Sequence, residues 1–269
     1  WVRDPYAVYA RDVLKLYALP RPDEPVDVRL RGTAIHTALE RFTERHGGLD
    51  LGAEAEAGFV ELMAEALAEH GAPDSQLARE RARAAQAAPW LVALERRRRA
   101  GAQLFVEKKS EWTFQVDGRD FVLTAKADRL EHRGHAIDVL DFKTGQPPTR
   151  RQIEAGLSPQ LTLTAAIVAA GGFGEVGAAA AGELVYVRIA GGRVPGEELV
   201  RASADETLVL AEQALSGLAA RIRRFDDPGQ PYVSWAVPQF IGQFEGDYDH
   251  LARLWEWHVI GDGEAGEAP

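Results

Sequence analysis

The chain has 269 residues, a formal net charge of −10 at pH 7 and no cysteine. The lack of cysteine excludes disulfides, thiolate zinc sites and iron–sulfur clusters, and it fits the reducing cytoplasm where we expect the protein. A protein that simply coats DNA should be basic, so the charge argues against that class. The longest apolar stretches are too short to span a bilayer, and Trp1 opens no signal peptide, so we expect no membrane attachment.

Helical patterns dominate the first hundred residues. Predicted helices cover 1–20, 32–46, 53–70 and 74–100. Prolines 20, 22 and 25 mark a linker, and Pro89 should kink the last helix or begin a new one. The block at about 32–100 is interpreted as a helical insertion before a catalytic core at about 101–225, inside one domain that covers 1–260.

Strand patterns follow the helical block. Strands are predicted at 103–107, 111–117, 120–128, 136–143 and 183–189. Asp117-Gly118 is a hairpin signal between two of them. Helices are predicted at 158–170 and 203–225, with an aromatic helix near 248–258 and a disordered tail at 261–269. This order predicts an α/β domain with a mixed sheet.

One triplet, Asp141-Phe142-Lys143, ends a largely apolar strand and carries the strongest chemical signal. Strand side chains alternate faces, so Asp141 and Lys143 point the same way and Phe142 points into packing. Asp128 ends the neighbouring strand. Carboxylates suit Mg²⁺, and an adjacent ammonium can orient water or neutralise negative charge, as phosphodiester hydrolysis requires. The alternative is an ordinary surface Asp–Lys pair. Asp138 should lie on the opposite face and be dispensable.

Four motifs in order resemble a known family. They are Gly32 to Glu40 (G-x-x-x-H-x-x-L-E), Leu123 to Leu130, Asp141 to Gly145, and Pro159-Gln160-Leu161. Together they resemble the RecB-type nucleases of the PD-(D/E)XK superfamily. Asp4-Pro5-Tyr6 and the segment from Tyr248 to Ala252 resemble the C-terminal nuclease domain of AddB-type subunits of bacterial AddAB helicase–nucleases. The resemblance runs from about Asp4 to Trp257.

The resemblance implies a PD-(D/E)XK restriction-endonuclease-like mixed sheet flanked by helices, with one active site. It implies that His36 and Asp128 are ligands of Mg²⁺, or of Mn²⁺, together with groups around Asp141 and Phe142. Glu40 would lie nearby, one helical turn from His36.

The family also implies catalytic roles for Lys143 and Gln160. Lys143 would orient water or stabilise the phosphate in the transition state. Gln160 would lie over the DNA strand, but Thr164 stands where the family has a tyrosine, so the aromatic role is not expected here. Lys126 stands where the family often has glycine.

The implied function is hydrolysis of single DNA strands during double-strand break processing, in a heterodimer with an AddA-type helicase subunit. Many family members carry four cysteines for an iron–sulfur cluster. This chain has none, so its two ends must close by packing alone. Two alternatives stay open: an inactive nuclease fold that binds DNA or a helicase partner, and a metallohydrolase of small phosphate esters.

Three other features are expected to be ordinary. Glu107 and Glu111 flank two lysines and should face solvent, although either is a candidate for an acidic residue on the first core strand. Arg96 to Arg99 should be a solvated helix end. The G-x-G-x-x-G run from Gly172 to Gly177 follows a helix and precedes a strand, so it predicts a loop and not a dinucleotide site.

Overall fold

The computed structural model describes residues 2–17, 19, 28–47, 51–234 and 246–256. The chain divides into two compact units, one formed by residues 1–23 with 219–269 and the other by residues 24–218. The expected linker at prolines 20, 22 and 25 and the tail expected at 261–269 lie outside the described residues.

The helices before the sheet match the sequence pattern except the first, because the helix expected over 1–20 covers only residues 5–13 of the described backbone. They are α1 Pro5–Val8, a π-helical turn η1 Tyr9–Val13, α2 Val28–Arg45, α3 Ala55–Glu69 and α4 Asp74–Arg99. The apolar stripe of α2 is buried at Ile35, Leu39 and Phe42, as its spacing predicts. Pro89 lies inside α4 without ending it, so this proline does not start a new helix.

Five strands form a mixed sheet, which confirms the predicted fold class. They are β1 Gln103–Val116, β2 Arg119–Arg133, β3 Ala136–Lys143, β4 Ala180–Ile189 and β5 Gly196–Ala202, in that spatial order. Only β3 and β4 run parallel, and the chain crosses between them through α5 Arg150–Glu154 and α6 Gln160–Ala169. The strand β5 was not predicted, and β1 continues through the break expected between 107 and 111. The G-x-G-x-x-G run lies between α6 and β4 around the short 3₁₀ turn η2 Gly174–Val176, as predicted.

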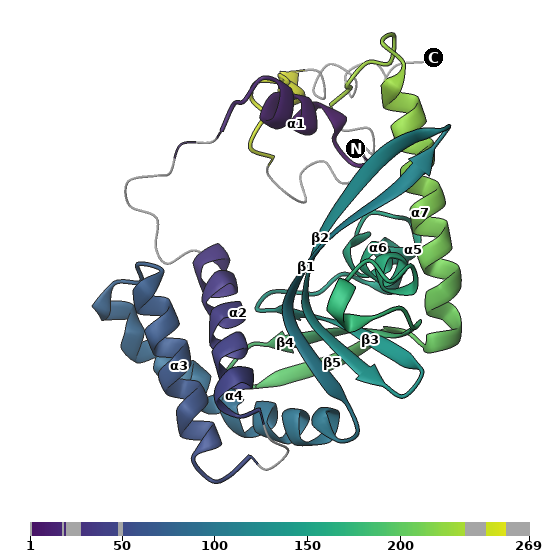
Figure 1. Cartoon of the computed structure of the whole chain (residues 1–269). Coiled ribbons are helices and arrows are strands. Elements are labelled where there is room, and N and C mark those ends of the chain that lie inside the picture. The colour runs from purple at the N-terminus through teal and green to yellow at the C-terminus, as the bar shows by residue number, and fades with distance from the viewer. Residues whose placement is uncertain (1, 18, 20–27, 48–50, 235–245, 257–269) are drawn as a thin grey trace, which may run out of the picture. The chain divides into compact units, whose positions relative to one another are not determined.

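Alternation along the central strands builds two cores, one on each face of the sheet. Phe142 and Val187 belong to the core shared with α2, α3 and α4. Val139 and Tyr186 belong to the opposite core, shared with α5, α6 and the first half of α7, Ala204–Asp226 (Figure 1). Both faces of β3 and β4 are therefore covered, as the continuous apolar character of these strands requires.

A network of buried ion pairs ties α4 to the sheet. Arg98 bonds Glu131 at 2.8 Å and Asp138 at 3.0 Å, while Arg99 bonds Glu95 at 2.7 Å. Only 8% of Arg98 and 2% of Arg99 is exposed. The prediction of a solvated helix end is therefore wrong for both residues: the acidic partners of Arg98 come from strands distant in the sequence, and Arg99 is paired with Glu95 of its own helix.

In the unit that holds the two ends of the chain, aromatic side chains pack together. The Tyr9 and Tyr232 rings lie 5.4 Å apart, and the Tyr6 N–H donates to the carbonyl of Val233. The Tyr248 hydroxyl donates to the carbonyl of Leu16 at 2.7 Å. These contacts supply the packing that the cysteine-free sequence requires. No helix in the described part of the chain combines the length and apolarity needed to cross a membrane.

Candidate active site

The candidate site lies where β2 and β3 separate. Their ladder ends at the pair Arg129–Leu140, so the next positions along the same register are Asp128 and Asp141. Beyond this point β2 pairs only with β1. The Phe142 N–H therefore has no β2 carbonyl to bind, and it donates instead to Asp128 Oδ2 at 3.0 Å. Asp128 thus satisfies a main-chain donor at the fork of the sheet.

Strand β1 is distorted at the same level. Glu107 and Asp128 lie between the pairs Val106–Arg129 and Lys108–Ala127 and are skipped by the β1–β2 ladder. The φ of Glu107 is +51°, a left-handed value that a glutamate rarely adopts. The side-chain alternation slips here: Ala127 and Leu130, three residues apart, both pack in the α6-side core. The distortion brings Glu107 and Asp128 to one ligand cluster, and backbone strain of this kind often marks a functional site.

Helix α2 completes this cluster with His36. Its Nδ1 lies 3.4 Å from Asp128 Oδ2 and 3.7 Å from Glu107 Oε1. The Phe142 ring packs edge-on against the imidazole, with centroids 6.5 Å apart. Glu40, one turn later on α2, lines the same small cavity. Buried Leu39 and its neighbours hold this helix against the sheet, so the position of His36 follows from core packing.

Asp141 and Lys143 lie beside the cluster. Lys143 Nζ is 2.5 Å from Asp141 Oδ2, and it also lies over the Tyr186 ring, 5.9 Å from the centroid. Only 2% of the Asp141 side chain is exposed, and neither of its carboxylate oxygens accepts a hydrogen bond of good geometry from the described residues. A carboxylate this deeply buried needs compensating charge, and the Lys143 ammonium supplies it here.

The two aspartates at the fork resist ionisation. Burial, with the neighbouring Asp141 charge, raises the pKa of Asp128 from 3.8 to about 6. Burial also raises the pKa of Asp141, although the Lys143 ammonium opposes the shift. Two carboxylates that share a poorly solvated site repel each other. This repulsion is the electrostatic state that a divalent ion relieves.

The third acid and the imidazole stabilise each other's charged forms. Burial acts to lower the pKa of His36, but the Glu107 hydrogen bond and the Asp128 charge outweigh it and the pKa is raised. Burial acts to raise the pKa of Glu107, but hydrogen bonds from His36 and Lys126 lower it overall. Lys126 forms an ion pair with Glu107. In the absence of another cation, His36 and Lys126 therefore share the neutralisation of Glu107.

The donor set fits a divalent metal ion. The ligand atoms of His36, Glu107 and Asp128 lie within 4.8 Å of one another, near the roughly 4.2 Å that separates opposite ligands of Mg²⁺. The charges around the site come from the carboxylates Glu40, Glu107, Asp128 and Asp141 and from the ammonium groups Lys126 and Lys143. If the His36 imidazole is neutral, the formal charges of these four carboxylates and two ammonium groups add up to −2. One divalent cation balances this charge.

The structure brings most of the predicted site residues together, and of the two candidate acids on the first core strand it places Glu107 at the site. Glu107 was expected to face solvent, but only 10% of its side chain is exposed and it faces His36. Glu111 is exposed, as expected. The residues around Glu107 do not indicate that it belongs to the ligand cluster. Its position across from Asp128 on the neighbouring strand reveals this.

Two predicted residues stand apart from this cluster. Gln160 begins α6 and is exposed, and no described contact joins it to Asp141 or Lys143. Thr164 is buried and its hydroxyl donates to the Gln160 carbonyl at 2.8 Å. Neither side chain therefore lies against the metal ligands, and the role of Gln160 over a nucleic-acid strand stays a prediction.

Asp138 is not the neutral control position that alternation suggested. It faces α4, away from Asp141, as the alternation predicts. However, its Oδ2 accepts from Arg98 and Arg133, and its Oδ1 accepts from the Glu183 N–H at 2.8 Å. The residue is 7% exposed. Its removal would take away one of the carboxylates that compensate buried Arg98, so a substitution here tests folding and not catalysis.

Comparisons with known proteins identify the family of the chain. An uncharacterised protein of Rickettsia bellii is 26% identical over 174 residues, and RT0391 of Rickettsia typhi is 28% identical over 179; each alignment covers 64% of this chain. The chain spans about a fifth of the length of these relatives. The crystal structure of SSO0001 aligns with 78% of this chain and 84% of its own, at 14% identity and a TM-score of 0.28. The family model of the PD-(D/E)XK nuclease superfamily matches residues 4–234, and the chain therefore belongs to this superfamily.

Proposed function

We propose that this chain is a metal-dependent nuclease that hydrolyses phosphodiester bonds at the fork between β2 and β3. The observation that carries the proposal is the buried Asp141 carboxylate, which is paired with the Lys143 ammonium and lies beside the cluster of His36, Glu107 and Asp128. Structural Asp138, by contrast, accepts hydrogen bonds at both of its oxygens within the protein.

The side chains divide the work between metal binding and phosphate stabilisation. His36, Glu107, Asp128 and Asp141 would hold Mg²⁺ or Mn²⁺, which supplies a Lewis acid and a water of lowered pKa. Asp141 holds the Lys143 ammonium in place, and 32% of the Lys143 side chain remains exposed to meet a phosphate. There the ammonium donates to a non-bridging oxygen and stabilises the charge that grows in the transition state.

The motifs support a finer proposal. We infer an AddB-type nuclease domain that cuts single DNA strands during double-strand break processing in the cytoplasm, beside an AddA-type helicase subunit. The ordered motifs from Gly32 to Gln160 support the type, and the relatives are about five times as long as the matched segment. The net charge of −10 supports the partner, because an acidic chain holds DNA weakly by itself.

Cleavage of a labelled single-stranded oligodeoxynucleotide tests the chemistry. Wild type should cleave with Mg²⁺ or Mn²⁺, and so should the control Glu111→Gln, which removes an exposed carboxylate outside the ligand cluster. Asp141→Asn should not cleave. Cleavage that persists in excess EDTA, or in Asp141→Asn, would contradict the metal mechanism. The partner proposal has its own test: at physiological salt the rate should rise when a helicase subunit feeds the strand, and equal rates would contradict it.

A further inference from the structure

Two lysines face each other directly on the hairpin next to the site. Lys109 of β1 pairs with Lys126 of β2 in the antiparallel register. Lys109 is exposed, and 55% of the Lys126 side chain is exposed. Like charges directly opposite each other destabilise a strand pair. Lys126 is paired with Glu107, whereas Lys109 makes no ion pair with the described residues.

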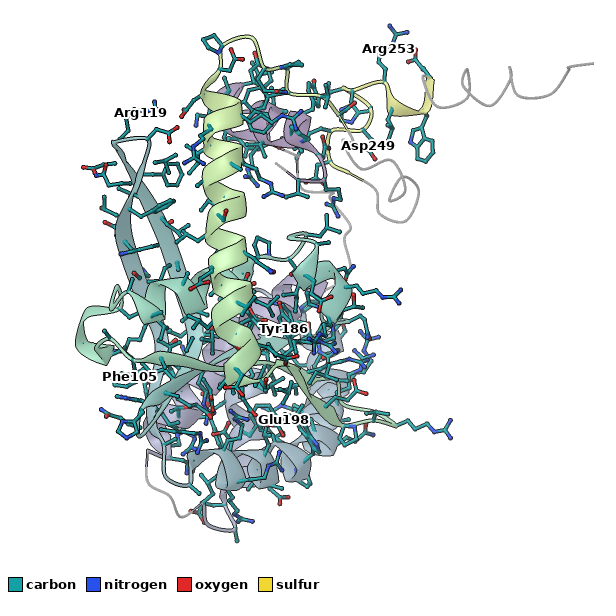
Figure 2. All side chains as sticks on the ribbon, turned by 90° about the vertical axis from the view of Figure 1, so that its right-hand side faces the viewer. Phe105, Arg119, Tyr186, Glu198, Asp249 and Arg253 are labelled. Atoms are coloured by element: carbon teal, nitrogen blue, oxygen red, sulfur yellow. The ribbon has the colours of Figure 1, made fainter. Side chains whose placement is uncertain are left out.

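Both lysines lie on the site side of the hairpin. Ser110 and Trp112 contact Gly172 near the α6-side core, and Lys108 forms an ion pair with Glu175 on that face. Alternation therefore directs Lys109 and Lys126 to the other face, where Glu107 meets His36. The hairpin projects beyond β3, from Phe105 near its base to Arg119 at its tip (Figure 2).

We propose that Lys109 and Lys126 form a subsite that binds the phosphate next to the scissile one on the substrate strand. This inference rests on the proposed function and adds the path of the nucleic-acid strand. The substrate would run from the fork between β2 and β3 along the outer face of the β1–β2 hairpin. Lys126 lies two residues from Asp128, about 6.6 Å along the strand. That is close to the step between neighbouring phosphates of an extended nucleic-acid strand.

Charge complementarity identifies the occupant. A metal ion on Glu107 would take over the neutralisation that Lys126 now provides, so its ammonium would become available to an anion. A single phosphate then meets two converging ammonium groups. The next residue on this face of β1 is Glu111, which is exposed and acidic. The subsite is therefore limited to one phosphate.

The test measures binding of a short fluorescent single-stranded oligodeoxynucleotide in Ca²⁺ at increasing salt, with an oligoribonucleotide as a second arm. For the double variant Lys109→Gln/Lys126→Gln, the slope of log K against log salt should become shallower by about 0.7, the value for one phosphate contact on a single strand. Lys108→Gln is the control on the other face of β1: it removes one ammonium, half the charge that the double variant removes, one residue from Lys109, and its slope should equal that of wild type. If the double variant changes the salt slope equally for the oligoribonucleotide and the oligodeoxynucleotide, the subsite recognises the phosphate and not the sugar.

A second readout follows the exchange of partners at Glu107. Lys126→Gln should tighten Mn²⁺ binding, measured by thermal shift without nucleic acid, because the ammonium no longer competes for that carboxylate. If the double variant keeps the wild-type salt slope while wild type binds and cleaves, the subsite is wrong and the nuclease proposal stands. If wild type neither binds the oligonucleotide nor cleaves it, both fail.

Discussion

Asp128→Asn should stabilise the metal-free protein while abolishing its function. Burial and the Asp141 charge raise the pKa of Asp128 from 3.8 to about 6. At 1.36 kcal/mol per pKa unit, ionised Asp128 costs the fold about 3 kcal/mol above pH 6. Asparagine removes this charge and keeps an oxygen for the Phe142 N–H. The sign follows from linkage: between 3.8 and 6 the folded state binds more protons than the unfolded state, so stability falls as pH rises.

Thermal unfolding in EDTA, scanned from below pH 3.8 to well above pH 6, measures this cost. Above pH 6 the variant should melt higher by up to roughly 6–12 °C, since about 3 kcal/mol corresponds to 2–4 °C per kcal/mol for a domain of this size. Below pH 3.8 the two proteins should melt together, because Asp128 is then protonated in both states. Mn²⁺ should raise the melting temperature of wild type and have much less effect on the variant.

Glu111→Gln provides the matched control, because it removes an exposed carboxylate from the same hairpin. Its melting curve should follow that of wild type at every pH. If Asp128→Asn melts at or below wild type above pH 6 in EDTA, then ionised Asp128 does not strain the fold. The argument that a metal ion relieves that strain would fail with it.

Four further outcomes follow from the same site. Lys143→Ala should lower cleavage roughly 100- to 1,000-fold with the fold intact, and Lys143→Arg should rescue poorly, since a planar fork does not replace a compact ammonium. Glu107→Gln should weaken Mn²⁺ binding in calorimetry, and unchanged affinity would remove it from the ligand set. Mn²⁺ should bind more tightly than Mg²⁺ because His36 supplies a nitrogen ligand, and Ca²⁺ should support little cleavage. Asp138→Ala should lose about 3–5 kcal/mol in denaturant unfolding, since it breaks buried ion pairs; unchanged stability would contradict the network.

Features that depend on local periodicity could be predicted from the sequence. Strand alternation places Phe142 in one core while Asp141 and its register partner Tyr186 face the other. The apolar stripe of α2 places His36 at the edge of its buried face. The order of elements predicts the mixed sheet, because a helical crossover separates β3 from β4 and such a crossover favours parallel pairing.

Features that depend on pairing between distant strands could not be predicted. Glu107 joins the site through its register with Asp128 and a positive φ, and nothing in the neighbouring residues signals either. Arg98 looks solvated in sequence because the acids that neutralise it lie on β2, β3 and β5. The strand β5 was missed because Leu199 and Val200 are its two large apolar residues and stand next to each other between charged ones, so its sequence GEELVRA shows no alternation.

The contrast between two neighbouring residues of β2 separates structural charge from functional charge. Arg129 is 2% exposed, and its guanidinium lies between Glu95 at 2.5 Å and Glu131 at 2.8 Å, so its charge is compensated within the protein. Asp128, one residue before it, shares its surroundings with Asp141, and burial raises the pKa of both carboxyl groups. The paired arginine holds β2 against α4, and the two aspartates lie where the β2–β3 ladder ends. The fold thus sets two carboxylates against the arginine but leaves two aspartates side by side, which is the arrangement that the proposed cation site requires.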